Sequence, residues 1–388
     1  MIETDLRKYA GSESQIGHVI RSFNTQNQDG NDLLPLNGAV LDDTKYPVLA
    51  EVLGKREQLT GITKVATTDC QHMVQSDDGE YCYVVKDTQV YRYKKSDNSY
   101  TLILTGDYDK GSDISCSADG RYVVFVTGES SGTLKCNIYS SRDYGATFTV
   151  FESPLSTSGF SAGKTFVSRS GLNMLAVVSN SQGPRFLSST DAGINWTLNA
   201  DKPDGIPPIT DAFACHENFE RILITTNNVV WYSDDIGVNW TEVSQRPDID
   251  IISIDPYSDN AVGVRDNKLN LQISDANGTS WQSIPIPDDI LYIQDVKYDN
   301  NAIIITATQA GSNWAMYVTL DKGGTWIPNA VFEHTYLFKY NPKRRLGSDI
   351  YFFHNPAQAL YRGRYDLTAK LPKSDIESEK IIADKVTS

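Results

Sequence analysis

Several features that define common protein classes are missing from this sequence. No apolar run approaches the length of a membrane-spanning helix, and residues 1–8 lack the apolar core of a signal peptide. We therefore expect synthesis in a cytoplasm and no membrane insertion. Helix-forming runs of Leu, Ala, Glu and Lys are also scarce, which together with 21 tyrosines and 27 glycines favours β structure.

Residue patterns for metal and thiol chemistry are lacking as well. The chain has an odd number of cysteines and no Cys-X-X-Cys pair, so neither a zinc site nor a disulfide framework is indicated. We expect the cysteines to be small buried residues in strands. The five histidines lie far apart, without metal-ligand spacing. We predict no metal and no cofactor. The cysteines are Cys70, Cys82, Cys116, Cys136 and Cys215, and the histidines are His18, His72, His216, His334 and His354.

Positive charge is in deficit. The formal net charge is −14, which argues against a nucleic-acid backbone or an anionic membrane surface as the main partner. Neither a glycine-rich phosphate loop nor a Gly-X-Ser-X-Gly elbow is present. The sequence thus predicts no catalytic residue.

What the chain does contain is one recurring segment. It reads Ser or Thr, then X-Asp-X-Gly, followed three residues later by Trp or Phe, and its copies begin at positions 141, 189, 233, 274 and 319, which are 48, 44, 41 and 45 residues apart. A period in this range indicates repeated supersecondary units. The copy at 274 is degenerate because its aspartate has moved by one position.

The recurring segment has a physical interpretation as a turn. Ser and Asp side chains accept hydrogen bonds from nearby backbone N–H groups, glycine adopts a positive φ, and the closing aromatic ring is expected to lie buried between sheets. Strand-like residues flank each copy, as at 229–232 and 241–243, so each copy predicts a hairpin turn.

The segment resembles the Asp-box, Ser-X-Asp-X-Gly-X-Thr-Trp, of sialidase-like β-propellers. The resemblance implies a structural and non-catalytic role on the outer rim of the fold for Ser141, Asp143, Gly145, Phe148, Ser189, Asp191, Gly193, Trp196, Ser233, Asp235, Gly237, Trp240, Gly278, Trp281, Thr319, Asp321, Gly323 and Trp326.

A second, looser turn precedes each recurring segment, as at 76–81 and 117–122, so that each unit holds two hairpins. Four antiparallel strands in every forty-odd residues are typical of a propeller blade. Counting units predicts an all-β, seven-bladed propeller over 63–372, with six blades as the alternative. The first and last units should pair, because an open propeller would leave unpaired sheet edges.

Residues 1–62 lie outside the repeat and predict a small α+β module. Strands are expected at 17–23 and 33–38, followed by a helix over 46–53 that ends at Gly54. The order strand, Leu-Asn-Gly turn and Tyr-Pro-X-Leu helix resembles the collar-type attachment module of bacteriophage tail and tail fibre proteins. Residues 373–388 are expected to form a charged tail, although docking in an assembly is an alternative.

The two resemblances together imply a non-enzymatic bacteriophage virion protein: a nozzle, fibre or adhesin subunit of the tail that forms a homo-oligomer. Its expected partners are other virion tail proteins and a host-surface glycan or receptor. The enzymatic alternative is a sialidase-like glycosidase, although the Phe/Tyr-Arg-Ile-Pro motif of that family is absent. A secreted propeller, which the missing signal peptide disfavours, and a photosynthetic-type assembly factor, which resembles the propeller but not the first 60 residues, also stay open.

Overall fold

The fold is described from a computed structural model of the 388-residue chain. The residues that it describes are 19–21, 32–35, 56–107, 110–128, 136–153, 162–180, 183–199, 212–215, 221–226, 229–243, 249, 251–255, 260–265, 270–274, 280–299, 302–309, 314–319, 321–329, 338–340, 349–354, 358–368 and 379–383.

The described strands form seven four-stranded antiparallel sheets, which we call blades 1 to 7 in chain order, and one three-stranded sheet. Blade 1 contains β4 (His72–Gln75), β5 (Tyr81–Lys86), β6 (Gln89–Lys94) and β7 (Ser99–Thr105). Blade 2 contains β8 (Lys110–Cys116), β9 (Val123–Gly128), β10 (Cys136–Ser141) and β11 (Thr149–Glu152). Blade 3 contains β12 (Ala162–Val167), β13 (Met174–Asn180), β14 (Gly183–Ser189) and β15 (Thr197–Leu198).

Blade 4 contains β16 (Ala212–Cys215), β17 (Ile222–Thr226), β18 (Val229–Ser233) and β19 (Thr241–Glu242). Blade 5 contains β20 (Ile251–Ile254), β21 (Ala261–Arg265), β22 (Asn270–Ser274) and β23 (Trp281–Ile284). Blade 6 contains β24 (Ile290–Asp299), β25 (Ala302–Gln309), β26 (Trp314–Thr319) and β27 (Ile327–Asn329). Blade 7 joins β28 (Phe338–Tyr340), β29 (Asp349–His354) and β30 (Ala359–Thr368) to β3 (Arg56–Thr67).

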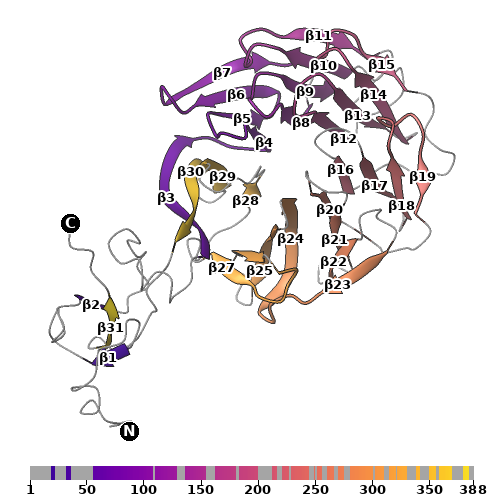
Figure 1. The fold of residues 1–388 in the computed structure, drawn as a ribbon. Helices are drawn as coiled ribbons and strands as arrows, with labels where there is room; N and C mark the ends of the chain where they lie inside the picture. Colours follow the sequence, from indigo (N-terminus) through magenta and orange to yellow (C-terminus); the bar gives the residue numbers. More distant parts are fainter. Residues whose placement is uncertain are drawn as a thin grey trace. The chain divides into compact units, whose positions relative to one another are not determined.

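The blades follow one another around a common axis, each with its first strand innermost (Figure 1). This is the predicted β-propeller, and its seven sheets rule out the six-bladed alternative. Successive strands of a blade run in opposite directions. The turns between the first and second strands and between the third and fourth strands therefore share one face of the propeller, which we call the turn face. The remaining connections lie on the opposite face, which we call the loop face.

Burial explains which residues form which strand. The middle strands of a blade are covered on both sides by neighbouring blades, so β9 and β10 are buried along their whole length and read as nearly continuous non-charged runs. Outer strands such as β11 are mostly exposed. One core cluster joins Val126 and Ile138 of blade 2 to Ala176 and Leu187 of blade 3, and others fill further interfaces between blades.

The two ends of the propeller meet in blade 7, where the early strand β3 is the outermost strand beside β30 (Figure 1). The predicted pairing of the first and last units therefore occurs through a strand that precedes the first blade.

The chain divides into two compact units, Gly61–Arg364 and the combination of Met1–Thr60 with Tyr365–Ser388. In the smaller unit, β31 (Glu379–Ala383) lies between β1 (Val19–Arg21) and β2 (Asp32–Pro35) and pairs antiparallel with both. Five residues of the expected charged tail thus form the central strand of a sheet. The helix expected over 46–53 lies outside the described residues.

Candidate functional site

The recurring turn is closed by its own side chains. In blade 3 the buried Ser189 hydroxyl accepts a hydrogen bond from the Gly193 N–H at 2.9 Å and donates one to the Asp191 carboxylate at 2.8 Å. Asp191 also accepts from the backbone N–H of Asn195 at 2.9 Å and from its side-chain amide at 2.6 Å. Both oxygens of the carboxylate are therefore committed to the turn.

Three other copies repeat this network. The hydroxyl of the first residue accepts from the glycine N–H at 2.8–2.9 Å, and the aspartate accepts from the N–H of the seventh residue at 2.7–2.9 Å. The seventh residue was not among the predicted site residues, although the Asp-box pattern includes it. The three networks are Ser141, Asp143, Gly145 and Thr147; Ser233, Asp235, Gly237 and Asn239; and Thr319, Asp321, Gly323 and Thr325.

Each of the four turns also contains two consecutive residues with positive φ. The glycine has a φ between 78° and 88°, as predicted, and the residue before it has a φ between 54° and 61°. These preceding residues are Tyr144, Ala192, Ile236 and Lys322. A left-handed non-glycine residue costs free energy, so the side-chain hydrogen bonds must stabilise a conformation that the backbone alone would avoid.

The hydrogen bonds also lower the pKa of the turn aspartates. The N–H and side chain of Asn195 lower the pKa of Asp191 to about 2, and the Thr325 N–H likewise lowers that of Asp321. At Asp143 and Asp235 burial opposes this effect, but the hydrogen bonds from Thr147 and Asn239 outweigh it, and the pKa is lowered. These carboxylates are acceptors that stay ionised at neutral pH.

The closing aromatic residues pack against the preceding blade. Trp196 lies 6.5 Å from Phe151, and Trp240 lies 4.9 Å from Phe186, measured between ring centroids. Phe148, Trp281 and Trp326 pack against the clusters of blades 1 and 2, blades 4 and 5, and blades 5 and 6. Each turn therefore ties its blade to the one before it.

The fifth copy departs from this pattern where it can be described. Gly278 lies outside the described residues. Ser274 is buried, but its hydroxyl accepts from the N–H of Ala261 on the neighbouring strand at 2.8 Å.

The inner turns of blades 1 to 3 form a linked chain on the turn face. The Asp77 N–H donates to the Ala118 carbonyl at 2.7 Å, and the Ala118 N–H donates to the Arg169 carbonyl at 3.2 Å. The buried Asp77 carboxylate pairs with the Arg169 guanidinium at 2.6 Å and so connects blade 1 to blade 3. These contacts stiffen the turn face near the axis.

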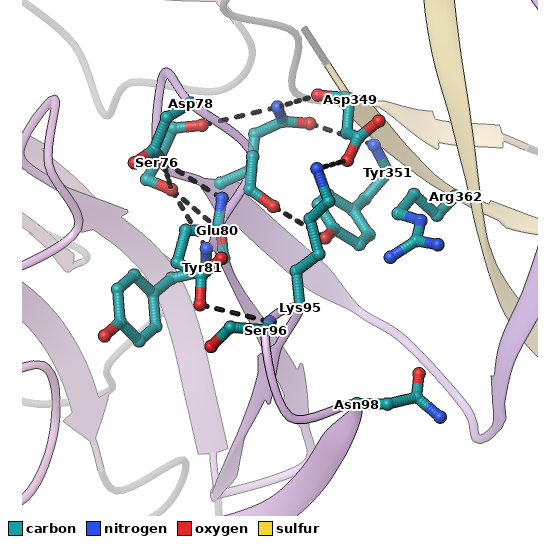
Figure 2. Close-up of polar contacts among 12 residues, drawn as sticks. Ser76, Asp78, Glu80, Tyr81, Lys95, Ser96, Asn98, Asp349, Tyr351 and Arg362 are labelled. Carbon is teal, nitrogen blue, oxygen red and sulfur yellow. Dashed lines mark hydrogen bonds and ion pairs between the residues drawn. The ribbon is translucent and has the colours of Figure 1, made fainter.

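Polar contacts also hold blade 1 to blade 7 (Figure 2). The buried Gln75 side chain donates to the Asp349 carbonyl at 2.8 Å and accepts from the Tyr351 N–H at 3.0 Å. Lys95 forms an ion pair with Asp349, and Figure 2 shows its side chain reaching toward that carboxylate. The Tyr351 hydroxyl donates to the Gly79 carbonyl at 2.7 Å. We call this set of contacts the closure seam.

The described residues also bear on metal clusters, membrane-spanning helices and reactive thiols. Among them, no group of three His, Cys, Asp or Glu side chains could hold a metal ion, and no helix is long and apolar enough to cross a membrane. Cys70, Cys82, Cys116 and Cys136 are buried cysteines that form no disulfide with one another. Burial raises the pKa of Cys136 to about 12 and that of Cys82 well above its usual range, so these thiols stay protonated.

Comparison with solved structures supports the fold. The chain is similar to YCF48 bound to D1 peptide, with 12% identity, a TM-score of 0.52 and coverage of 84% of this chain and 97% of that one. It is also similar to the GH74 xyloglucanase of Xanthomonas campestris, with 14% identity, a TM-score of 0.54 and coverage of 81% of this chain and 56% of that one. A third similar structure is the Cps50 (Swd1) β-propeller domain of Myceliophteria thermophila, with 9% identity, a TM-score of 0.54 and coverage of 78% of this chain and 99% of that one.

No family model and no curated protein sequence matches the chain. At 9–14% identity the structural similarities establish a β-propeller and nothing about activity, since these relatives include a hydrolase and a peptide-bound protein.

Proposed function

We propose that the chain is a non-enzymatic structural protein of a bacteriophage tail, serving as a nozzle, fibre or adhesin subunit. The observation on which this depends is the smaller unit, in which β31 lies between β1 and β2, so that the propeller is inserted between the two parts of a small module. The first part of that module is the segment that resembles a collar-type attachment module. In this proposal the module docks to the particle, and the propeller contacts sister subunits, other tail proteins or a host-surface receptor.

The chemistry of the recurring turns supports a structural role for the propeller. The carboxylates of Asp143, Asp191, Asp235 and Asp321 are occupied by hydrogen bonds within their own turns, and the closing aromatics contact the preceding blade. Such residues fix the blades in place, and a rigid propeller presents its loops in a fixed arrangement to a partner.

Locating the protein tests this proposal directly. Particles purified from a host that carries this gene together with its neighbouring genes should contain the chain, as detected by mass spectrometry, and antibody labelling should place it at the tail. Particles made without the gene should lack a tail component or fail to adsorb to the host. Complete, infectious particles that lack the chain would refute the proposal.

A hydrolase assay separates this function from the enzymatic alternative. The purified full chain should release no sugar from xyloglucan, the substrate class named for one structural relative, and should not cleave a fluorogenic sialoside. Turnover of either substrate would replace the structural function with a glycosidase.

A further inference from the structure

The innermost strand of blade 6 differs from its counterparts. β24 has 10 residues, whereas the innermost strands of the other blades have three to seven. Its first residues follow the connection from blade 5, so they lie at the loop face near the axis (Figure 1). β24 is also an edge strand, because within the described sheet it pairs with β25 alone.

Two irregularities in register give β24 an unusual exposure pattern. Ile290 pairs with Gln309 and Tyr292 with Thr308, which leaves Leu291 without an opposite residue, and a second shift leaves Gln294 without one. Neighbouring strand residues normally point to opposite sides. Here the shifts keep Ile290 and Ile293 in the core between blades 5 and 6, while Leu291 and Tyr292 are 50% and 37% exposed. Bulges of this kind re-aim side chains and often occur beside functional sites.

An acidic turn precedes the exposed pair. The Ile290 N–H donates to the Pro287 carbonyl at 3.2 Å, which places Asp288 and Asp289 at the tip of a turn. Asp289 accepts from the Tyr317 hydroxyl at 2.8 Å and from the Gln309 amide at 2.6 Å. Both aspartates are exposed, and the two contacts hold the Asp289 carboxylate in place beside the exposed pair.

We propose that Leu291 and Tyr292, together with the carboxylates of Asp288 and Asp289, form a docking site for an extended segment of another protein. The segment carries an apolar side chain next to Lys or Arg. The apolar side chain covers the exposed pair, and the cation meets the acidic turn. The edge of β24 that has no partner among the described strands suits an extended backbone, which can hydrogen-bond along it. The net charge of −14 favours the approach of a basic partner. This site goes beyond the proposed function and does not depend on the chain being part of a bacteriophage particle.

Peptide binding to the full chain tests the site. The probe is a fluorescein-labelled peptide of alternating Leu and Arg, and the readout is fluorescence anisotropy. We expect saturable binding that falls at least tenfold in the double variant Leu291→Ser, Tyr292→Ser. We expect a fall of about threefold, with a weaker salt dependence, in Asp288→Asn, because an exposed charge pair contributes little to affinity and is screened by salt.

Matched controls separate this site from general attraction to an acidic protein. Leu102→Ser removes a leucine of nearly equal exposure (49%) from the outer strand of blade 1 and should leave binding unchanged. Peptides of alternating Ser and Arg, or of alternating Leu and Glu, should bind at least tenfold more weakly. A benzophenone-bearing Leu-Arg peptide should crosslink within 285–299 of the unaltered protein, a measurement that needs no variant.

Three results would overturn the proposal. The first is equal binding by the wild type and the double variant. The second is equal affinity for the Ser-Arg peptide, which would indicate charge attraction alone. The third is competition by soluble xyloglucan for the peptide, which would indicate a glycan site.

Discussion

At the scale of single residues, the first hydroxyl of the recurring turn connects two other residues of that turn. Ser189 is buried and bonds at once to the Gly193 N–H and the Asp191 carboxylate. A buried donor left without a partner costs more than a typical hydrogen bond contributes. The serine is therefore more important to stability than its size suggests.

Replacement of this hydroxyl should destabilise the propeller. Ser189→Ala leaves the Gly193 N–H without its acceptor, and we expect a loss of about 1–3 kcal/mol in the free energy of unfolding. Denaturant-induced unfolding measures the loss. The control Ser283→Ala, at an exposed strand position, should change stability by less than about 0.5 kcal/mol. Equal effects of the two substitutions would contradict the role of the turn hydroxyl.

Because the pKa values of the turn aspartates are lowered by folding, we expect the free energy of unfolding to fall in acid. The pKa of Asp191 is about 2 in the folded chain, below its ordinary unfolded value of about 3.9. A depressed folded pKa contributes stability above the unfolded pKa, and this contribution is lost as the pH falls through the folded pKa. The urea midpoint should therefore fall between about pH 4 and pH 2. The difference between the wild type and Asp191→Asn should shrink over the same range, whereas that between the wild type and Ser283→Ala should not.

At the scale of elements, the turns of the turn face combine strained backbone with close packing. Gly171 and Gly237 have nearly the same φ, 80° and 79°. A Cβ atom at Gly171 would overlap the Tyr122 ring of the preceding blade, whereas at Gly237 it would lie 3.4 Å from Phe186. The two positions therefore separate the backbone requirement for glycine from the requirement for space.

Alanine at these two glycines should have unequal effects. Gly237→Ala adds the cost of a left-handed alanine, about 1–2 kcal/mol. Gly171→Ala adds that cost and the overlap with Tyr122, about 1–3 kcal/mol more. Thermal and denaturant unfolding of the two variants measure the difference. If Gly237→Ala proved the more destabilising, the packing described around Tyr122 would be incorrect.

Local patterns predicted the elements well wherever the physics is local. The turn at 189–196 was predicted because Ser189, Asp191 and Gly193 bond within eight residues of one another. The strand β31 was not predicted, because Ile381 and Ile382 are adjacent and show no alternation, and their partners lie more than 340 residues away in β1 and β2. The exposed pair in β24 depends on register shifts, which no periodicity in the sequence reveals.

At the scale of the whole molecule, the closure seam was predicted only in outline. The expectation that the first and last units would pair follows from the cost of free sheet edges. The particular contact, Gln75 with the backbone of Asp349 and Tyr351, joins residues more than 270 positions apart. Such a contact is a result of the completed ring rather than of any local motif.

Disrupting the closure seam should weaken the whole propeller. Gln75→Ala leaves the buried Asp349 carbonyl and Tyr351 N–H without partners, and we expect a loss of about 2–4 kcal/mol. Hydrogen exchange should accelerate in β29 and β4 more than in blades 3 and 4. The exposed Gln282→Ala is the control and should leave both measurements unchanged. Uniform acceleration in all blades would show that the ring opens elsewhere.

The position of β31 has a consequence for how the protein is made. A ribosome completes every propeller strand before it reaches residues 379–383. The sheet of β1 and β2 cannot form until those residues are made, because β31 lies between the two strands. Any receptor that recognises the finished three-stranded sheet therefore rejects chains whose translation stopped early, even when their propellers are whole.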